Sequence, residues 1–472
     1  MKKILLSITV AFIALNSMAN NITVTAATLS GQSLSAHTEV VNFTVSWENS
    51  WHTSINESNY DGAWIFVKFR RLTGTGDWRH CTLTAATVGT GTPGILTVQN
   101  DLKGAFINRN ADGIGNVSFT GNQLVWNYGA DGVADNETVE INVFGLEMVY
   151  IPTGAFQLGS GGTETYAFQT GPTAAAGTNS VPYKVTNAAI TFGSTAGNLN
   201  TSGNGPTTGT LPSSYPTGYN AFWIMKYETT QQQYVDFLNH LDLARANTNN
   251  LVATFFSGTH PNLIAPQPER TMNYVNSQRL AALADWSGLR PYTEMEFEKI
   301  CRGANIPPLP NEYVWGSTTI SPLVSVTNTG LTNEAVNLPS TANTNIAGSF
   351  SAGTLTRAGI FARATLSTRE LSGSSYYGVM NMADNALEVC INTVNATGLA
   401  FDGSINGDGY LNATGNTDIT NWTNSLSYGW RGGAYNSALS AARTSDRATA
   451  GTNDGGGSNF PYLSIRLART AQ

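Results

Sequence analysis

The sequence predicts an α+β protein in which an N-terminal all-β sandwich precedes a loop-rich domain of mixed helices and strands. In the first part of the chain, apolar and polar residues alternate over short runs, as they do in strands that are buried on one face. Further along, apolar residues recur at the three- and four-residue spacing of helices. Charged residues make up only 12% of the chain and 48 of its 472 residues are glycine, a composition that favours loop-rich β structure over a helical bundle.

The start of the chain predicts export. Lys2 and Lys3 precede an apolar run over residues 4–15, and small residues surround Ala19. This is the pattern of a secretory signal peptide, expected over residues 1–19. The run is shorter than the roughly 20 apolar residues that span a bilayer, and no later segment is long enough. We therefore expect a secreted chain, extracellular or at the cell surface, without a membrane span.

Residues 20–145 are expected to form a β-sandwich of the fibronectin type III or immunoglobulin-like kind. Turns rich in glycine and aspartate, such as residues 129–132, separate its strands. The clearest alternating runs cover residues 41–47, 63–70, 116–119, 123–126 and 138–143. Modules of this kind are mostly spacers or adhesive surfaces, and nothing in this one indicates catalysis.

Helices are expected only after residue 145. A helix that begins near Gln231 is capped by Thr229 or Thr230. Thr293 precedes a further helix and has Glu296 three positions on, which is the pattern of a capping box. The first of these helices is expected over residues 231–238, and one other helical run covers residues 276–286.

Charge and cysteine content exclude several functions. The formal net charge is −7 and no basic cluster occurs, so the chain has no electrostatic footprint for nucleic acid. The chain has only three cysteines, Cys81, Cys301 and Cys390, which is too few for a disulfide framework. A bridge between Cys301 and Cys390 and a set of buried free thiols both remain open.

Several segments after Leu146 carry motifs of one family. Residues 147–160 match M-V-x-I-P-x-G-x-F-x-M-G-S, and residues 288–303 match G-x-R-L-P-T-E-A-E-W-E-x-A-A-R-G. Residues 430–443 match R-G-G-[ST]-[WF] followed by A-A-R. In these motifs and their order, residues 146–472 resemble the formylglycine-generating (sulfatase-modifying factor) family. The resemblance implies a variant of the C-type lectin-like fold.

The same resemblance implies a structural Ca²⁺. Residues 377–388 are similar to the family pattern Y-G-L-x-[DN]-M-x-G-N-x-W-E, in which a calcium ion is ringed by the positions matching Asn381, Asp384, Ala386 and Glu388. Amide, carbonyl and carboxylate oxygens suit this hard cation. Asp384 stands where the family has glycine. The alternative is that Glu388 pairs with an arginine and holds no metal. A second family calcium site near Asn343 stays unassigned.

The oxidases of the family hold copper with two thiolates in the segment that matches residues 430–443. Here no cysteine follows Cys390, and Ser437 stands where the first thiol would be. A hydroxyl is a poor ligand for Cu(I), so formylglycine generation is excluded. Another branch of the family binds iron through histidines, but no pair of histidines here has H-x-x-x-H spacing. The lack of a thiol pair and of a histidine iron site favours a protein without enzymatic activity, and an enzyme of unrecognised chemistry stays open as the alternative.

The arginines near the C-terminus allow two roles, as buried ion-pair partners of Glu294, Glu298 or Asp446, or as the lining of a ligand groove. Residues 435–457 are rich in Tyr, Asn, Ser, Asp and Gly, a composition that resembles an antibody paratope. The residues expected to contact a ligand are Arg431, Tyr435, Asn436, Arg443 and Arg447.

These observations favour an exported, catalytically silent protein that binds a protein or glycan at the cell surface, or that builds a surface assembly. A metal-dependent oxidoreductase of the same family with unrecognised chemistry is the first alternative. A structural subunit of an extracellular filament, which assembles with copies of itself, is the second.

Overall fold

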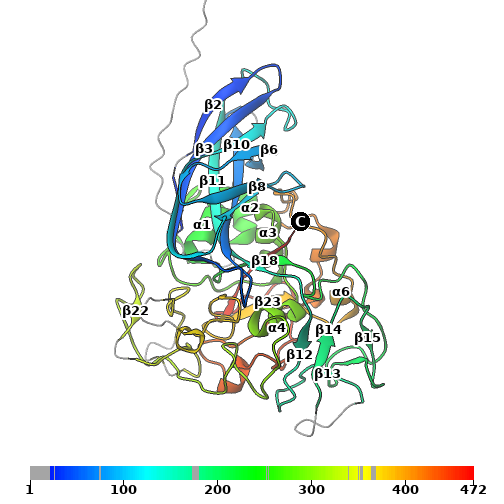
Figure 1. Cartoon of the computed structure of the whole chain (residues 1–472). Coiled ribbons are helices and arrows are strands. Elements are labelled where there is room, and N and C mark those ends of the chain that lie inside the picture. The colour runs from blue at the N-terminus through cyan, green and yellow to red at the C-terminus, as the bar shows by residue number, and fades with distance from the viewer. Residues whose placement is uncertain are drawn as a thin grey trace, which may run out of the picture.

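The structure is a computed structural model. It describes residues 22–471 except 26, 74–75, 173–179, 251, 253–254, 338–339, 349, 351–353 and 363–367. The expected signal peptide, residues 1–19, lies outside the described residues. Figure 1 shows the N-terminal strands at one end of the molecule and the helices and long loops at the other.

The first sheet contains strands from the N-terminal part of the chain only, and all of its pairs are antiparallel. Its long strands β3 and β10 form the centre because their alternating residues bury one face. In order, the strands are β1 (Thr23–Val24), β3 (Thr38–His52), β10 (Gly113–Asn127) and β6 (Leu83–Thr87), with β2 (Thr28–Ser33) on β3 and β7 (Thr90–Gly91) on β10.

The second sheet joins the two parts of the chain. Its order is β26 (Ala468–Thr470), β18 (Phe222–Met225), β11 (Val139–Ile151), β4 (Asp61–Arg71), β9 (Ala105–Arg109) and β8 (Gly94–Val98), with β5 (Arg79–His80) on β4. β11 pairs with β4 on one side and with β18 on the other. The division expected between residues 145 and 146 therefore falls inside one continuous strand.

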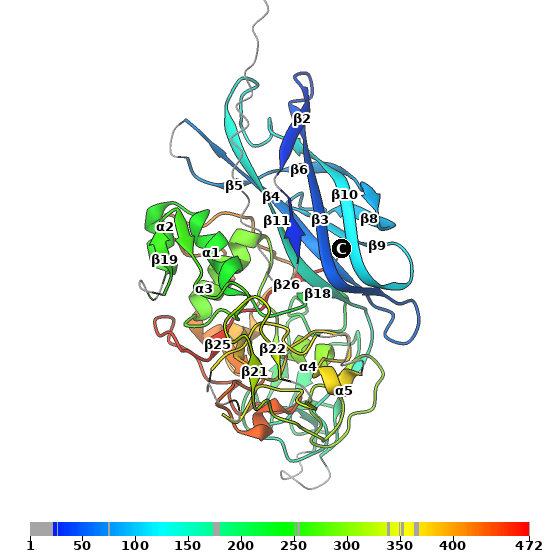
Figure 2. The same cartoon turned by 90° about the vertical axis from the view of Figure 1, so that its left-hand side faces the viewer.

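β4 is buried on both of its faces. Ile65 and Val67 belong to the core that this sheet shares with the first sheet. Trp64 and Phe66 point the other way and belong to the core around the helices, where Phe66 meets Trp286 edge-to-face at 5.4 Å. Because side chains alternate along a strand, one sheet serves two cores. The second sheet is thus the middle layer of the molecule (Figure 2).

The four longer helices are α1 (Gln231–Asn239), α2 (Leu243–Asn249), α3 (Ser277–Ser287) and α4 (Glu294–Arg302), and two short ones are α5 (Arg369–Ser372) and α6 (Ala396–Leu399). Helices α1 and α3 pack on the face of the middle sheet that lies opposite the first sheet, where Phe237 and Trp286 meet Phe66 and Phe144, whereas α4 and α6 lie among the short strands and loops (Figure 1). Thr293 forms the capping box of α4 that the sequence predicts, and Thr230, one of the two residues expected to cap α1, forms a capping box there as well. Gly288 ends α3 in the left-handed conformation, with φ 70°.

The remaining chain forms short strands and long loops. A small sheet of β24 (Tyr428–Arg431), β23 (Leu387–Ile391) and β25 (Leu463–Ser464) lies beside α4, and its register places Glu388 opposite Arg431. The other short strands are β12 (Phe156–Leu158), β13 (Gln169–Thr170), β14 (Tyr183–Val185), β15 (Thr191–Phe192), β16 (Leu199–Asn200), β17 (Gly209–Thr210), β19 (Ser257–Thr259), β20 (Asn262–Ile264), β21 (Val326–Thr327) and β22 (Ala335–Val336). Within the described chain, no helix has the length and apolar content needed to cross a membrane.

Candidate functional site

A buried network of charges lies between α4 and the segment after β24. Arg431 contacts Glu294 at 3.1 Å and Glu298 at 3.2 Å, and Arg447 contacts Glu294 at 2.8 Å. All four side chains are fully buried. Each arginine also donates to main-chain carbonyls, Arg431 to that of Thr444 at 2.8 Å. The network ties the C-terminal segment to the first turns of α4.

The electrostatics of Glu294 show how strongly this network is coupled. Burial alone would raise the pKa of its carboxyl, but the charges of Arg447 and Arg431 and their hydrogen bonds outweigh burial and lower the pKa to about 2. Glu294 also accepts hydrogen bonds from the amide and hydroxyl of Thr393, at 2.7 and 2.6 Å. Its negative charge is therefore held in the interior over the whole neutral pH range.

The structure divides the residues expected to contact a ligand. Arg431 and Arg447 are wholly interior and paired with carboxylates, so they do not line a surface groove. Asn436 is exposed, and Tyr435 and Arg443 are half-buried. The Nη1 of Arg443 donates to Asn311 Oδ1 at 3.1 Å. Only the last three of these residues remain as candidates for a ligand surface.

Further aromatic rings accompany Tyr435. Phe255 lies 6.0 Å from Tyr274, and Phe460 lies 5.5 Å from Tyr462, measured between ring centroids. Burial, followed by the neighbouring Tyr274 and Tyr462, raises the pKa of the Tyr435 hydroxyl. We call the half-buried rings of Phe255, Tyr274, Tyr435, Phe460 and Tyr462 the aromatic surface. Sequence reasoning found only Tyr435, because the other rings come from segments that are separate in the chain.

Where the family's oxidases have their first thiol, Ser437 holds a turn. Its hydroxyl accepts a hydrogen bond from the amide of Ala434 at 2.9 Å. All three cysteines are free and buried, so Cys301 and Cys390 do not form a bridge. Burial, with a further contribution from Glu294, raises the pKa of the Cys390 thiol well above its usual value. Such a thiol is protonated and unreactive at neutral pH.

At the predicted calcium site, Glu388 has protein partners. Its Oε1 accepts a hydrogen bond from Arg466 Nε at 2.8 Å and lies 2.7 Å from Nη2 of the same arginine, and its Oε2 accepts a hydrogen bond from the Tyr292 hydroxyl at 2.6 Å. Glu388 and Arg466 are fully buried. This is the arginine pairing that the sequence left open as the alternative to a metal.

The other predicted calcium ligands have fewer partners. The carboxylate of Asp384 accepts hydrogen bonds from Asn381 Nδ2 at 3.1 Å and from the backbone amide of Asn345 at 2.6 Å. Among the described residues, Asp384 forms no ion pair. Burial raises the pKa of Asp384 to about 7. The side-chain oxygen of Asn345 is buried without a hydrogen-bond partner in the same part of the chain. Ala386 donates its amide to the Asp384 carbonyl at 2.8 Å.

The donor chemistry at this site fits a cation in part. A buried carboxylate without a cationic partner and a nearby amide oxygen without a donor are groups that a hard cation would satisfy. Glu388 differs, because Arg466 already neutralises it. Positive φ angles occur at Asn381 and Asn385, at 57° and 68°, and not at Asp384, so aspartate in place of the family's glycine causes no backbone strain.

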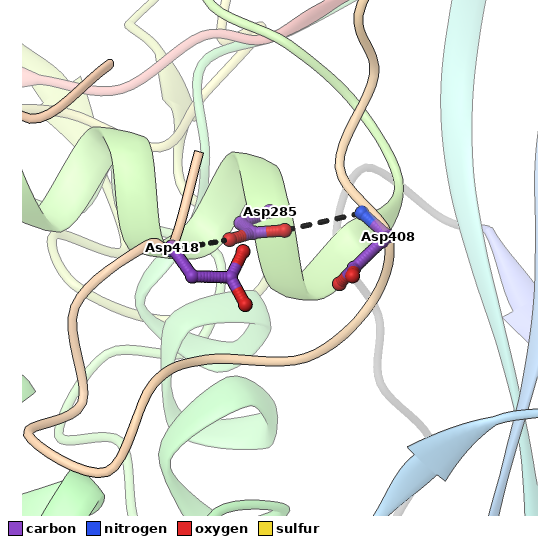
Figure 3. A group of neighbouring side chains, drawn as sticks. All are labelled: Asp285, Asp408 and Asp418. Carbon is purple, nitrogen blue, oxygen red and sulfur yellow. Dashed lines mark hydrogen bonds between the residues drawn. The ribbon is translucent and has the colours of Figure 1, made fainter. Parts of the chain in front are cut away.

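Three aspartates lie together at the C-terminal end of α3 (Figure 3). Oxygens of Asp285, Asp408 and Asp418 lie within 4.8 Å of one another. Asp285 is fully buried, and burial raises the pKa of its carboxyl to about 7, with a further contribution from Asp408. It accepts hydrogen bonds from the amides of Asp408 and Asp418, at 3.1 and 3.3 Å. The cluster organises the loop over residues 408–418, and its oxygens are of the type that could hold a cation.

Asp408 and Asp418 lie in a stretch rich in glycine and asparagine that is typical of turns, and this local pattern gives no sign of their partner on α3. Asp285 lies near the end of a predicted helix, so nothing in its local pattern distinguished it from a solvated helical residue. Its neighbour Trp286 packs against Phe66 of the middle sheet. An acidic residue next to a buried tryptophan, late in an apolar helix, was the available signal.

The comparison with protein families agrees with this architecture. The model of the sulfatase-modifying factor enzyme 1-like domain matches residues 137–471. This covers more than half of the chain, and the chain therefore belongs to that family. A search of curated proteins found no match.

Proposed function

We propose that this chain is an exported, catalytically silent member of its family that binds a protein or glycan at the cell surface. The observation that carries the proposal is the lack of any cysteine after Cys390. Ser437, at the position of the first thiol, uses its hydroxyl to hold a turn. Without thiolates there, the segment has no soft ligands for copper.

The binding site in this proposal is the aromatic surface together with Asn436. Aromatic rings supply rigid contact area at a low entropic cost, and small amides adapt their hydrogen bonds to a partner. Tyr435 and Asn436 follow the buried Arg431 closely in sequence, so the charge network fixes the base of the segment that carries them. The surface is thereby preorganised, which favours binding.

Catalytic silence is tested with the purified mature chain, a cysteine-containing peptide and oxygen, with and without added copper. We expect no conversion of the cysteine to formylglycine, as measured by mass spectrometry of the peptide. Conversion above the level of a protein-free control would contradict the proposal and support the oxidoreductase alternative.

The binding surface is tested on arrays of immobilised glycans and cell-surface proteins. Tyr435→Ala is expected to abolish the binding that the wild-type chain shows. The control is Tyr166→Ala, because Tyr166 is 44% exposed and lies outside the aromatic surface. Equal binding by wild type and Tyr435→Ala would exclude this surface as the site.

We also propose that the site at Asn381, Asp384, Ala386 and Glu388 binds a structural Ca²⁺. The buried, unpaired carboxylate of Asp384 and the unsatisfied oxygen of Asn345 support the proposal. We expect the purified chain to retain calcium on dialysis, as measured by mass spectrometry of metals, and EDTA to lower its Tm. Asp384→Asn should lose the metal, whereas Asp402→Asn in a surface turn should retain it. A metal-free chain whose Tm does not respond to EDTA would exclude the site.

A further inference from the structure

Three charged side chains meet in the interior where the N-terminal layer joins the rest of the chain. Lys226, directly after β18, has its Nζ 3.0 Å from Asp61 Oδ2 of β4 and 3.1 Å from Glu147 Oε2 of β11. β11 lies between the other two strands, so the glutamate stands on the middle strand. None of these side chains is more than 3% exposed. We call the three residues the buried triad, and neither the predicted calcium site nor the aromatic surface uses them.

The carboxyl group of Asp61 is held in place by residues of β3. Its Oδ2 accepts a hydrogen bond from the Trp47 indole at 2.9 Å, and its Oδ1 accepts hydrogen bonds from the Ser50 hydroxyl at 2.7 Å and the Trp51 amide at 3.0 Å. Donors around a carboxyl group stabilise the negative charge that collects on its oxygens when a nucleophile adds to its carbon. These donors are therefore arranged like the oxyanion hole of an acyl-transfer reaction.

The amine of Lys226 lies against this carboxyl group. Its Nζ also donates to the Asn49 carbonyl at 3.1 Å, and the centre of the Trp51 ring lies 5.0 Å away. Burial acts to lower the pKa of the amine, but the charge of Asp61, with that of Glu147, outweighs burial and raises the pKa. The amine therefore becomes a nucleophile only when a neighbouring carboxylate takes its proton.

Glu147 is placed to take that proton. Burial raises the pKa of its carboxyl to about 8, although the charge of Lys226 acts against burial. Its second oxygen, Oε1, is buried and has no hydrogen-bond partner among the described residues. Protonation removes the charge from this unpaired oxygen and turns the ion pair into a neutral pair, which costs less in a buried site than in water. Glu147 thus fits the role of a general base.

We infer that Lys226 and Asp61 condense into an amide inside the folded chain, with Glu147 as the proton carrier. Once Glu147 has taken a proton from the amine, Nζ adds to Cγ of Asp61 and the Nζ–Cγ bond forms. One Cγ–O bond of the former carboxylate then breaks. Its oxygen leaves as water, with the proton that Glu147 returns and a second proton from the amine. An ammonium and a carboxylate thus become a neutral amide and water, and the balance requires no oxidant, nucleotide or metal.

The amide joins the two parts of the chain covalently. It replaces two buried charges, whose removal from water is costly, with one neutral group. It also ties β4, which precedes the family domain, to the residue after β18, which lies inside that domain. The condensation occurs once in each chain and has no turnover, so it goes beyond the proposed function and leaves catalytic silence unaffected.

The test is the mass of the full mature chain after denaturation, with its N-terminus read from the same spectra. We expect a mass that is lower than the calculated mass by one molecule of water. Proteolysis and tandem mass spectrometry should then give a branched peptide in which residues 61 and 226 are joined. A chain of full calculated mass would overturn the inference. So would a loss of water within one linear peptide, which marks a succinimide at an Asp–Gly pair.

Two variants separate the amide from a plain ion pair. Lys226→Arg keeps the positive charge and cannot form this amide, so it should have its full calculated mass. Glu147→Gln keeps the shape of the base and should slow condensation roughly 10²- to 10⁴-fold, so that unlinked chain remains in fresh preparations. Lys184→Arg, at an exposed lysine of β14, is the matched control and should lose water like wild type.

The variants also have contradicting outcomes. Loss of water from Lys226→Arg would place the reaction elsewhere in the chain, and condensation of Glu147→Gln at the wild-type rate would remove Glu147 from it. Either result would overturn the inference. If a variant does not fold, the mass and the branched peptide of the wild-type chain decide alone.

Discussion

Arg431 is the residue on which the interior of the C-terminal segment depends. It is fully buried and neutralises Glu294 and Glu298, which lie one turn apart on α4. A buried carboxylate that loses its cation is far more costly than a surface ion pair. The need to neutralise these buried carboxylates therefore explains why residue 431 is an arginine, without any role in ligand binding.

The charge network predicts a large difference between two arginines. Arg431→Met should lower the free energy of unfolding by about 3–5 kcal/mol, because it leaves buried carboxylates without a partner. Arg443→Met should lower it by about 1 kcal/mol or less, since the one side-chain contact described for Arg443 is a hydrogen bond to Asn311. Urea denaturation of both variants measures the two values. If the two variants lose similar free energies of unfolding, the buried charge network does not contribute more to stability than the single hydrogen bond of Arg443.

Lys299 gives a prediction that depends on pH. It is fully buried on α4, its Nζ donates to the Gly154 carbonyl at 2.5 Å, and burial lowers the pKa of its amine to about 7. Below pH 7 the amine is charged in the folded and the unfolded chain, and the folded chain bears the cost of burying it. As pH rises from 7 towards 10, the folded chain releases the proton and this cost disappears.

Lys299→Met should therefore stabilise the chain most at low pH. We expect a gain of about 2 kcal/mol at pH 6 that shrinks steadily towards pH 9. Urea denaturation at each pH provides the measurement. Lys184→Met, which changes an exposed lysine of β14, is the control and should show no such trend. A gain that is constant with pH would mean that Lys299 carries the same charge in the folded and the unfolded chain over this range, so that burial does not lower its pKa.

At the scale of elements, α4 depends on its first residues. The Thr293 hydroxyl accepts a hydrogen bond from the Glu296 amide at 3.1 Å, and the Glu296 carboxylate accepts one from the Thr293 amide at 2.9 Å. This cap orients the helix that carries Glu294 and Glu298. The stability of the helix start and the geometry of the charge network are thus coupled.

The cap leads to a prediction. Thr293→Ala should cost about 1–2 kcal/mol of stability, because it removes a capping bond at a buried helix. Thr368→Ala removes the same kind of bond from α5, none of whose residues is buried, and should cost less than about 0.5 kcal/mol. Thermal unfolding of both variants distinguishes the cases. If both variants lose the same stability, burial of the helix does not increase the effect of losing its cap.

The sequence predicted these elements better than it predicted their arrangement. The capping box at Thr293, the cap of α1 and the strands over residues 41–47 and 63–70 lie where local patterns placed them. What the alternation in β4 did not reveal is burial on both faces. The available signal was its nearly continuous apolar run, which is typical of a strand between two layers. Local periodicity describes one face at a time and cannot say what covers the other.

The candidate site was predictable to the same degree. The family motifs located Glu388 and the arginines, but a motif does not say which oxygen is already occupied. Tyr292 and Arg466 reach Glu388 from distant parts of the chain.

At the scale of the whole molecule, the shared sheet predicts that the chain unfolds as one unit. β11 pairs with β4 from Val139 opposite Arg71 to Val149 opposite Asp61. Separation of the two parts would expose this ladder together with Trp64 and Phe66. Scanning calorimetry should therefore show a single transition whose calorimetric and van't Hoff enthalpies agree.

A fragment over residues 146–472 tests the same point. It lacks β4 and half of β11, so it should be insoluble or lack a cooperative transition, whereas residues 22–472 should fold. Circular dichroism and light scattering on the two chains are the measurements. A soluble fragment with cooperative unfolding, or two separate transitions in the longer chain, would show that the parts are independent.

The continuity of β11 also has a geometrical consequence. If a flexible linker joined the two parts, it would limit only the distance between the aromatic surface and the first sheet, and it would leave their relative orientation free. A strand that runs unbroken through both parts sets the direction as well, because neither part can swivel without breaking the ladder. If the first sheet is attached to a larger structure, the aromatic surface will therefore face in one fixed direction relative to the point of attachment.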